Sequence, residues 1–235
     1  GGLRIGVSAR LAKQALAKFG GVEAGEIEEL WHGLDAPYED LFAWLSGAGE
    51  KPAPDMRGAF RPVMLAHPLI AKKDRDDPDA INPDMITPET FAAEWKWDGI
   101  RVQAVSENGV RRLYTRTGDD ISHTFPDVVA AMEFDAVLDG ELLVRKPDGN
   151  VAPFNDLQQR LNRKTVSKKM LSERPAFIRA YDILHHGEED LRALTFRERR
   201  AKLDALLGAS PTDRFDVSPL VEITDAASLN ALRNA

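Results

Sequence analysis

The sequence predicts an α+β fold, with a mainly antiparallel sheet and flanking helices, preceded by a short all-α segment. Three observations support this prediction. Apolar residues recur at helical spacing up to residue 45, they alternate with polar residues in several short segments after residue 90, and a stretch rich in Gly and Pro separates the two regions. Hairpins beside helices favour an antiparallel sheet.

Three short helices are expected at the start of the chain. The first follows a possible cap at Ser8 and ends at Gly20 and Gly21. The third follows Pro37 and ends at Gly47. In chain order, the residues that share an apolar face are Leu11, Ala15, Leu16 and Phe19, then Ile27, Leu30, Trp31 and Leu34, then Tyr38, Leu41, Phe42 and Leu45.

Residues 46–62 are rich in Gly and Pro, which is typical of a linker or an irregular crossing segment. We therefore place a domain boundary there. Residues 1–60 are expected to form the helical part and its linker, and residues 61–235 the α+β unit.

The α+β unit contains clear strand and turn signals. Asn108 and Gly109 form a two-residue hairpin turn. Strands are predicted at residues 91–97, 100–105, 110–116, 137–144, 177–184 and 215–223. Helices are predicted near 126–132 and 156–163, and a third helix begins with a capping box at Thr195 and Glu198 and ends at Gly208.

Composition narrows the class of protein. There is no Cys, which excludes disulfides and thiolate nucleophiles and favours a reducing, cytoplasmic location. No apolar stretch is long enough to suggest a membrane span. The net charge is -7, but residues 145–174 hold eight basic and three acidic residues.

Within that basic segment, Arg160, Arg163 and Lys164 lie near helical spacing. Cationic side chains that pair with phosphates give affinity for DNA without sequence preference, so these three residues are candidate DNA contacts. A solvated helix face is the alternative interpretation.

The most informative run is Glu94-Trp95-Lys96-Trp97-Asp98-Gly99-Ile100-Arg101. In a strand, Glu94, Lys96 and Asp98 would point to one side and the two tryptophans to the other. Spacing alone leaves two interpretations open, a reactive lysine between carboxylates or an edge strand with solvated charges and tryptophans in the core.

This run resembles the Lys-x-Asp-Gly-x-Arg signature that ATP-dependent DNA ligases share with RNA ligases and mRNA capping enzymes, and the upstream Glu94 is typical of the DNA ligases. Residues 2–44 resemble the end of the helical DNA-binding domain of the same ligases. Four further segments match the family's motifs in order, namely Tyr114-Thr115-Arg116, Leu138-Asp139-Gly140-Glu141, the run from Gln158 to Lys164, and Ala180-Tyr181-Asp182-Ile183-Leu184.

The resemblance implies that Lys96 attacks the α-phosphorus of ATP, expels pyrophosphate and retains AMP on its nitrogen. Only a neutral amine can attack. Because the pKa of an unperturbed lysine is about 10.4, this mechanism needs surroundings that favour the uncharged amine.

The resemblance also implies roles for the neighbouring motifs. Glu94 would recognise the adenine amino group, and Tyr181 would stack on the purine. Arg101 and Arg116 would hold the ribose and phosphate, because the guanidinium fork pairs with two phosphate oxygens at once. Glu141 would contact the ribose or help to hold Mg²⁺.

The expected partner is nicked double-stranded DNA, and a monomer is expected. Two alternatives stay open, a capping or RNA-ligase nucleotidyltransferase that uses the same lysine, and a non-catalytic DNA-binding fragment. The family's Glu-Gly-x-x-x-Lys and Lys-x-Lys motifs do not occur before Ala235. We therefore expect a fragment of a longer ligase, with little or no activity alone.

Overall fold

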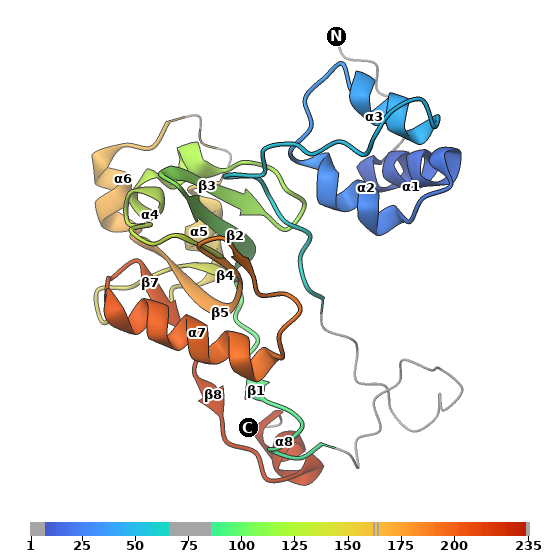
Figure 1. Cartoon of the computed structure of the whole chain (residues 1–235). Coiled ribbons are helices and arrows are strands. Elements are labelled where there is room, and N and C mark those ends of the chain that lie inside the picture. The colour runs from blue at the N-terminus through green and yellow to red at the C-terminus, as the bar shows by residue number, and fades with distance from the viewer. Residues whose placement is uncertain (1–7, 66–85, 162, 164, 234–235) are drawn as a thin grey trace.

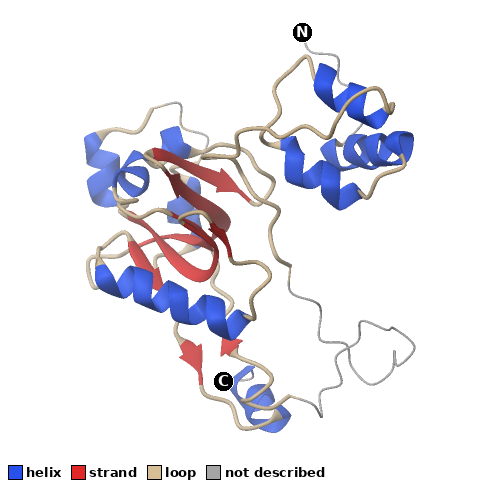
Figure 2. Cartoon of the chain, viewed as in Figure 1, coloured by secondary structure: helices blue, strands red, loops and turns tan. Residues whose placement is uncertain are grey.

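The computed structural model describes residues 8–65, 86–161, 163 and 165–233. A small helical unit and a larger α+β unit lie side by side (Figure 1), and Figure 2 shows that all the strands belong to the larger unit. Among the described residues, no helix is long and apolar enough to cross a membrane.

The helical unit consists of α1 (Ala9–Gly20), α2 (Ala24–Trp31) and α3 (Glu39–Leu45). The side chain of Ser8 caps α1 by accepting a hydrogen bond from a backbone N–H of the first turn, and Gly21 ends it with a φ of 63°, a conformation that favours glycine. The three helices enclose a small core of their own, made by Ala17, Ile27, Leu41 and Leu45. The three predicted helices are confirmed.

The main sheet has the order β3-β2-β4-β5-β6, with antiparallel neighbours, and β7 pairs in parallel with β5. A separate two-stranded sheet joins β1 and β8. The strands are β1 (Ala93–Glu94), β2 (Ile100–Glu107), β3 (Val110–Thr115), β4 (Ala136–Val144), β5 (Ala176–His186), β6 (Glu189–Asp190), β7 (Phe215–Val217) and β8 (Leu220–Val221). The predicted α+β class is confirmed.

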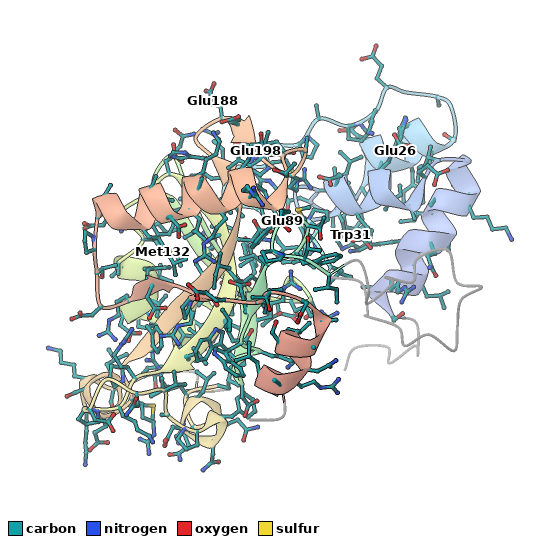
Figure 3. All side chains as sticks on the ribbon, turned by 90° about the horizontal axis from the view of Figure 1, so that it is seen from below. Glu26, Trp31, Glu89, Met132, Glu188 and Glu198 are labelled. Atoms are coloured by element: carbon teal, nitrogen blue, oxygen red, sulfur yellow. The ribbon has the colours of Figure 1, made fainter. Side chains whose placement is uncertain are left out.

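Helices cover one face of this sheet and enclose the main core. Alternate strand residues such as Val102, Leu138 and Ile178 pack there against Val128 and Leu203 from the helices. Figure 3 views the layers from below, with α7 along the sheet and the helical unit to one side. The helical elements are η2 (Ser122–Thr124), α4 (Pro126–Ala130), α5 (Phe154–Gln158), α6 (Lys168–Glu173), α7 (Phe196–Ala209) and α8 (Ala226–Arg233).

The opposite face of the sheet carries most of the polar side chains of β2 and β4 beside a small apolar cluster of Val105, Val137 and Leu184, and we call it the polar face. The chain that leaves the helical unit crosses one half of it. We call residues 56–64 the strap. Arg61 forms a buried ion pair with Glu107 at 2.8 Å, and its backbone N–H donates to Gln103 at 2.7 Å. Tyr114 donates to the carbonyl of Gly58 at 2.7 Å. The second half of the segment with linker composition is therefore packed on the sheet.

A bulge interrupts β5 on the polar face. Asp139 of β4 faces Asp182, whereas the next residue, Gly140, faces Ala180. Tyr181 therefore has no partner in β4 and is the extra residue of the bulge. Such a residue increases the local twist and re-aims a side chain.

Four predicted elements differ from the observed ones. The strand expected at 215–223 is divided into β7, which pairs with β5, and β8, which pairs with β1. The strand expected at 91–97 is reduced to Ala93–Glu94, because its partner β8 has only two residues. The helix expected at 156–163 ends at Gln158, where the chain turns and carries Arg160 inward. Helix α7 continues through Gly208 to Ala209.

Candidate active site

Lys96 lies in a loop between β1 and β2, and its side chain is exposed. Gly99 brings this loop against β4, since a Cβ at Gly99 would collide with the carbonyl of Leu142. The glycine of the motif is therefore needed for close approach of the loop to the strand. A lysine in this position is accessible to a ligand on the polar face.

Arg101 and Glu141 lie opposite each other on β2 and β4. The guanidinium of Arg101 donates to Asp139 from Nε at 3.2 Å and to the carbonyl of Met64 at 2.7 Å. Only 1% of the Asp139 side chain is exposed, so its charge depends on Arg101. Arg101 therefore joins the strap to Asp139 of β4.

The charge of Lys96 acts on the carboxyl group of Glu141. Burial raises the pKa of Glu141 to about 7, while the backbone N–H of Gly99 and the positive charges of Lys96 and Arg101 oppose that rise. Near neutral pH the carboxyl group is poised between its two forms. A bound cation would favour the charged form.

Tyr181 lies beside this cluster. The Arg101 guanidinium carbon is 5.7 Å from the centre of the Tyr181 ring, within the range of a cation–π contact. Burial, followed by the charge of Asp139, raises the pKa of the Tyr181 phenol, so the hydroxyl stays neutral. The bulge in β5 thus brings an aromatic ring next to Arg101 and Glu141.

The residues that flank Lys96 do not alternate as a regular strand would. Trp95 is 49% exposed, which contradicts the alternative interpretation of an edge strand with both tryptophans in the core. Trp97 is held in place, because its indole N–H donates to Ser218 Oγ at 3.0 Å and Arg179 stacks on its ring at 4.1 Å. The irregular loop, rather than a continued strand, separates the two rings.

Glu94 is directed toward α7. It forms an ion pair with Arg200 at 3.0 Å. Burial raises the pKa of Glu94, and the charge of Arg200 opposes that rise. The carboxylate expected to read the base is thus already held by a cation.

Arg116 is exposed in the turn after β3 and forms no hydrogen bond or ion pair with another described residue. Strand pairing and a cation–π contact therefore group Arg101, Glu141 and Tyr181, and the charge of Lys96 acts on Glu141. No contact among the described residues joins Arg116 to this group. Its guanidinium is available to an external anion.

The structure contradicts the surface position expected for Arg160. The side chain is fully buried, forms an ion pair with Asp127 at 2.6 Å, donates to the carbonyl of Thr124 and stacks on Phe125 at 4.6 Å. A charge with so many internal partners is not available to DNA. It faces inward because the turn after α5 reverses the direction of the side chain that helical spacing predicts.

Of the two other candidate DNA contacts, Arg163 is exposed and donates to the carbonyl of Gln159 at 3.1 Å. Lys164 lies outside the described residues. The basic segment thus presents Arg163 to solvent and uses Arg160 internally.

Sequence reasoning assigned no site role to Asp139, Arg200 or Ser218. Asp139 could have been found, because it lies two residues from Glu141 and so shares its face of the strand. Nothing near Arg200 or Ser218 in the sequence indicates that they contact residues 94–97, since both come more than 100 residues later in the chain.

Within the described part of the chain, no group of three or more His, Cys, Asp and Glu side chains is placed to hold a metal ion. Magnesium usually needs only one or two carboxylates, with phosphate oxygens and water completing its shell. Glu141 meets that requirement beside Lys96, so the residues present fit a magnesium ion that arrives with a nucleotide.

A cavity of about 790 Å³ lies elsewhere, between β1, β8 and the start of α7. Its lining includes Phe91, Phe196, Arg200 and Leu220, but none of Lys96, Arg101, Glu141 and Tyr181. It is adjacent to the candidate site through Arg200 and is separate from Lys96.

The fold and these motifs define a nucleotide-transfer domain with a lysine on the polar face of an antiparallel sheet. The family described as ATP dependent DNA ligase domain matches residues 68–235. The chain belongs to this family, and the resemblance found in its motifs is confirmed.

Individual relatives agree with this assignment. The chain is 31% identical over 224 residues to a probable DNA ligase of Koribacter versatilis. The match covers 93% of this chain and 37% of that protein. It is 29% identical over 241 residues to a DNA ligase of Methanosphaerula palustris, and this match covers 99% of this chain and 41% of the relative. The chain thus spans well under half the length of these relatives.

Among solved structures, the fold resembles a mycobacterial DNA ligase D complexed with ATP and MES. The TM-score is 0.51 and the sequence identity 25%, and the match covers 65% of this chain and 47% of the other.

Proposed function

We propose that this chain is the nucleotide-transferring part of an ATP-dependent DNA ligase, with Lys96 as the nucleophile. The amine of Lys96 attacks the α-phosphorus of ATP, the bond to the β-phosphate oxygen breaks, and pyrophosphate leaves. The resulting lysine–AMP then passes AMP to the 5′-phosphate of nicked DNA. Attack by the 3′-hydroxyl seals the strand and releases AMP.

The single observation that carries this proposal is the grouping of Lys96, Arg101, Glu141 and Tyr181 on one open half of the polar face. The positive charges of Lys96 and Arg101 both act on the carboxyl group of Glu141. Tyr181 offers a neutral ring on which a purine can stack. An anionic triphosphate would be drawn to the two cations.

Three roles depend on the bound nucleotide. Glu94 recognises the adenine amino group, and Arg116 swings to the ribose or phosphate from its free position in the turn. Glu141 holds Mg²⁺, which when bound neutralises charge on the phosphate oxygens. Arg116 is exposed and Glu94 is held by Arg200, and each of the three roles requires ATP to be present.

Nicked double-stranded DNA is the proposed partner, and Arg163 and Lys164 are its proposed contacts in this chain. Arg163 is exposed, as a phosphate contact must be. We further propose that residues 1–60 are the end of the DNA-binding domain, because the helices have a separate core. A cytoplasmic location accords with the absence of Cys, and we propose that the protein is a monomer.

The family assignment favours a DNA ligase over a capping enzyme or RNA ligase. The non-catalytic alternative is tested in the full-length protein that contains this sequence. Incubation with radiolabelled ATP and Mg²⁺ should give an acid-labile AMP adduct that is lost in Lys96→Ala and in Lys96→Arg, while both variants unfold at the wild-type temperature. An adduct that persists in Lys96→Ala would show that another residue is the nucleophile.

A further inference from the structure

Arg200 of α7 makes contacts that reach both sides of the Lys96 loop. One terminal nitrogen lies 3.0 Å from Glu94, two residues before Lys96. The other donates to the backbone carbonyl of Ser218 at 2.6 Å, and Nε donates to Asp204 at 3.0 Å. The guanidinium therefore has an acceptor on each of its three nitrogens.

Ser218 extends this arrangement to the residue after Lys96. Its hydroxyl accepts the indole N–H of Trp97 at 3.0 Å, and its backbone N–H donates to Ala180 of β5 at 2.8 Å. Ser218 is 1% exposed, so it is a fixed point in the interior. Trp97 is thus fastened to the same point as Arg200.

The ion pair of Arg200 and Glu94 is largely shielded from water. The Arg200 side chain is 11% exposed and that of Glu94 24%, so water competes little for the ion pair. Burial alone would favour the neutral form of Glu94, and Arg200 is the first cation that counteracts it. Without Arg200, the carboxylate would lose its charge partner and would keep only the hydroxyl of Ser218 beside it.

We propose that Arg200 is a positioning residue that fixes Glu94 and, through Ser218 and Trp97, the loop of Lys96, and that it thereby sets the base selectivity of the nucleotide site. This inference rests on the proposed function, in which Glu94 reads the adenine amino group. Arg200 itself touches neither nucleotide nor reacting atoms. It acts by holding the carboxylate in the direction that distinguishes an amino group from a carbonyl group on the purine.

The experiment measures adduct formation in the full-length protein as a function of ATP concentration, and again with GTP. Arg200→Ala is expected to raise the half-saturating ATP concentration about tenfold and to narrow the preference for ATP over GTP by a similar factor, as loss of one charge-assisted contact would do. Arg197→Ala, one turn earlier on α7, removes the same charge without touching Glu94 and should match the wild type.

A double-mutant cycle with Glu94→Ala tests the route. If Arg200 acts through Glu94, then Arg200→Ala changes selectivity in the wild type and hardly at all in the Glu94→Ala background. An equal change in both backgrounds, or an unchanged half-saturating concentration and ATP to GTP ratio, overturns the proposal. A purely structural role would lower only the final amount of adduct and the unfolding temperature.

If Arg200→Ala does not fold, the same measurements are made on Arg200→Gln and judged by the same outcomes. This variant keeps a hydrogen-bond donor for Ser218 but lacks the positive charge. The two proposals fail differently. Absence of an adduct in the wild type overturns the proposed function, whereas a wild-type adduct with normal selectivity in the Arg200 variants overturns only the role of Arg200.

Discussion

Arg160 and Arg163 lie three residues apart, carry the same charge and have opposite surroundings. Arg160 is enclosed by Asp127, the carbonyls of Thr124 and Arg174, and the ring of Phe125. Arg163 faces solvent. At this scale the environment of a charge, and not its presence, decides whether it supports folding or binding.

Arg160→Met is expected to lower the free energy of unfolding by about 3 kcal/mol, because it leaves the largely buried Asp127 without its closest cation. Urea denaturation measures this change. Arg163→Ala is the matched control and should cost less than about 0.5 kcal/mol. Equal stability of Arg160→Met and the wild type would contradict an internal role for Arg160.

Glu141→Gln should change how stability depends on pH. The pKa of Glu141 in the folded protein is about 7, above the usual 4.5, so its contribution to stability is complete below pH 4.5 and is lost as the pH rises through 7. The variant lacks this loss. In urea denaturation with EDTA, its stability relative to the wild type should therefore increase from pH 4.5 to pH 8, and a constant difference would refute the assignment.

At the scale of elements, the sequence predicts those helix ends and turns whose determining residues are neighbours in the chain. The cap at Ser8, the turn at Asn108 and Gly109, and the capping box of Thr195 and Glu198 could each be predicted, because each is complete within a few residues. The bulge at Tyr181 could not, since it is defined by pairing with β4.

The candidate site divides in the same way. Its motifs predicted Lys96, Arg101, Glu141 and Tyr181, and the sheet groups the last three beside the loop of Lys96. The surroundings of Glu94 and the inward turn of Arg160 depend on contacts with residues distant in the chain, so periodicity could not reveal them.

Thr195→Ala tests the start of α7, the helix that supplies Arg200. The Thr195 hydroxyl accepts from the backbone N–H of Glu198 at 3.4 Å, and Glu198 accepts from the backbone N–H of Thr195 at 2.9 Å. Loss of the cap should lower the free energy of unfolding by about 1 kcal/mol, measured by urea denaturation. Thr195→Ser keeps the hydroxyl and should retain most of the stability; equal losses would show that the cap contributes nothing.

For the whole molecule, the decisive feature is the strap that connects the helical unit to the polar face. A second link joins the units, since Arg192 contacts Glu29 of α2 at 2.6 Å. The strap ends beside the site, where the carbonyl of Met64 accepts from Arg101. The helical unit is thus joined to the larger unit at two places, through the strap and through the ion pair of Glu29 with Arg192.

Glu107→Gln should loosen the strap. It leaves the guanidinium of Arg61, 8% exposed, without its carboxylate, which is expected to cost about 3 to 5 kcal/mol in the free energy of unfolding. Limited proteolysis should then cut within residues 56–64 faster than in the wild type. Glu133→Gln, at an exposed position, should leave the cleavage rate unchanged, and resistance of both variants would argue against the strap as an anchor.

The strap covers only half of the polar face. Two glutamates on that surface are therefore expected to serve different purposes, one for stability and the other for activity. Glu107 lies under it and Glu141 lies beyond it. In a scan of all substitutions, damage at the first should appear as lower abundance of the protein in cells. Damage at the second should appear as lost product from normal amounts of protein.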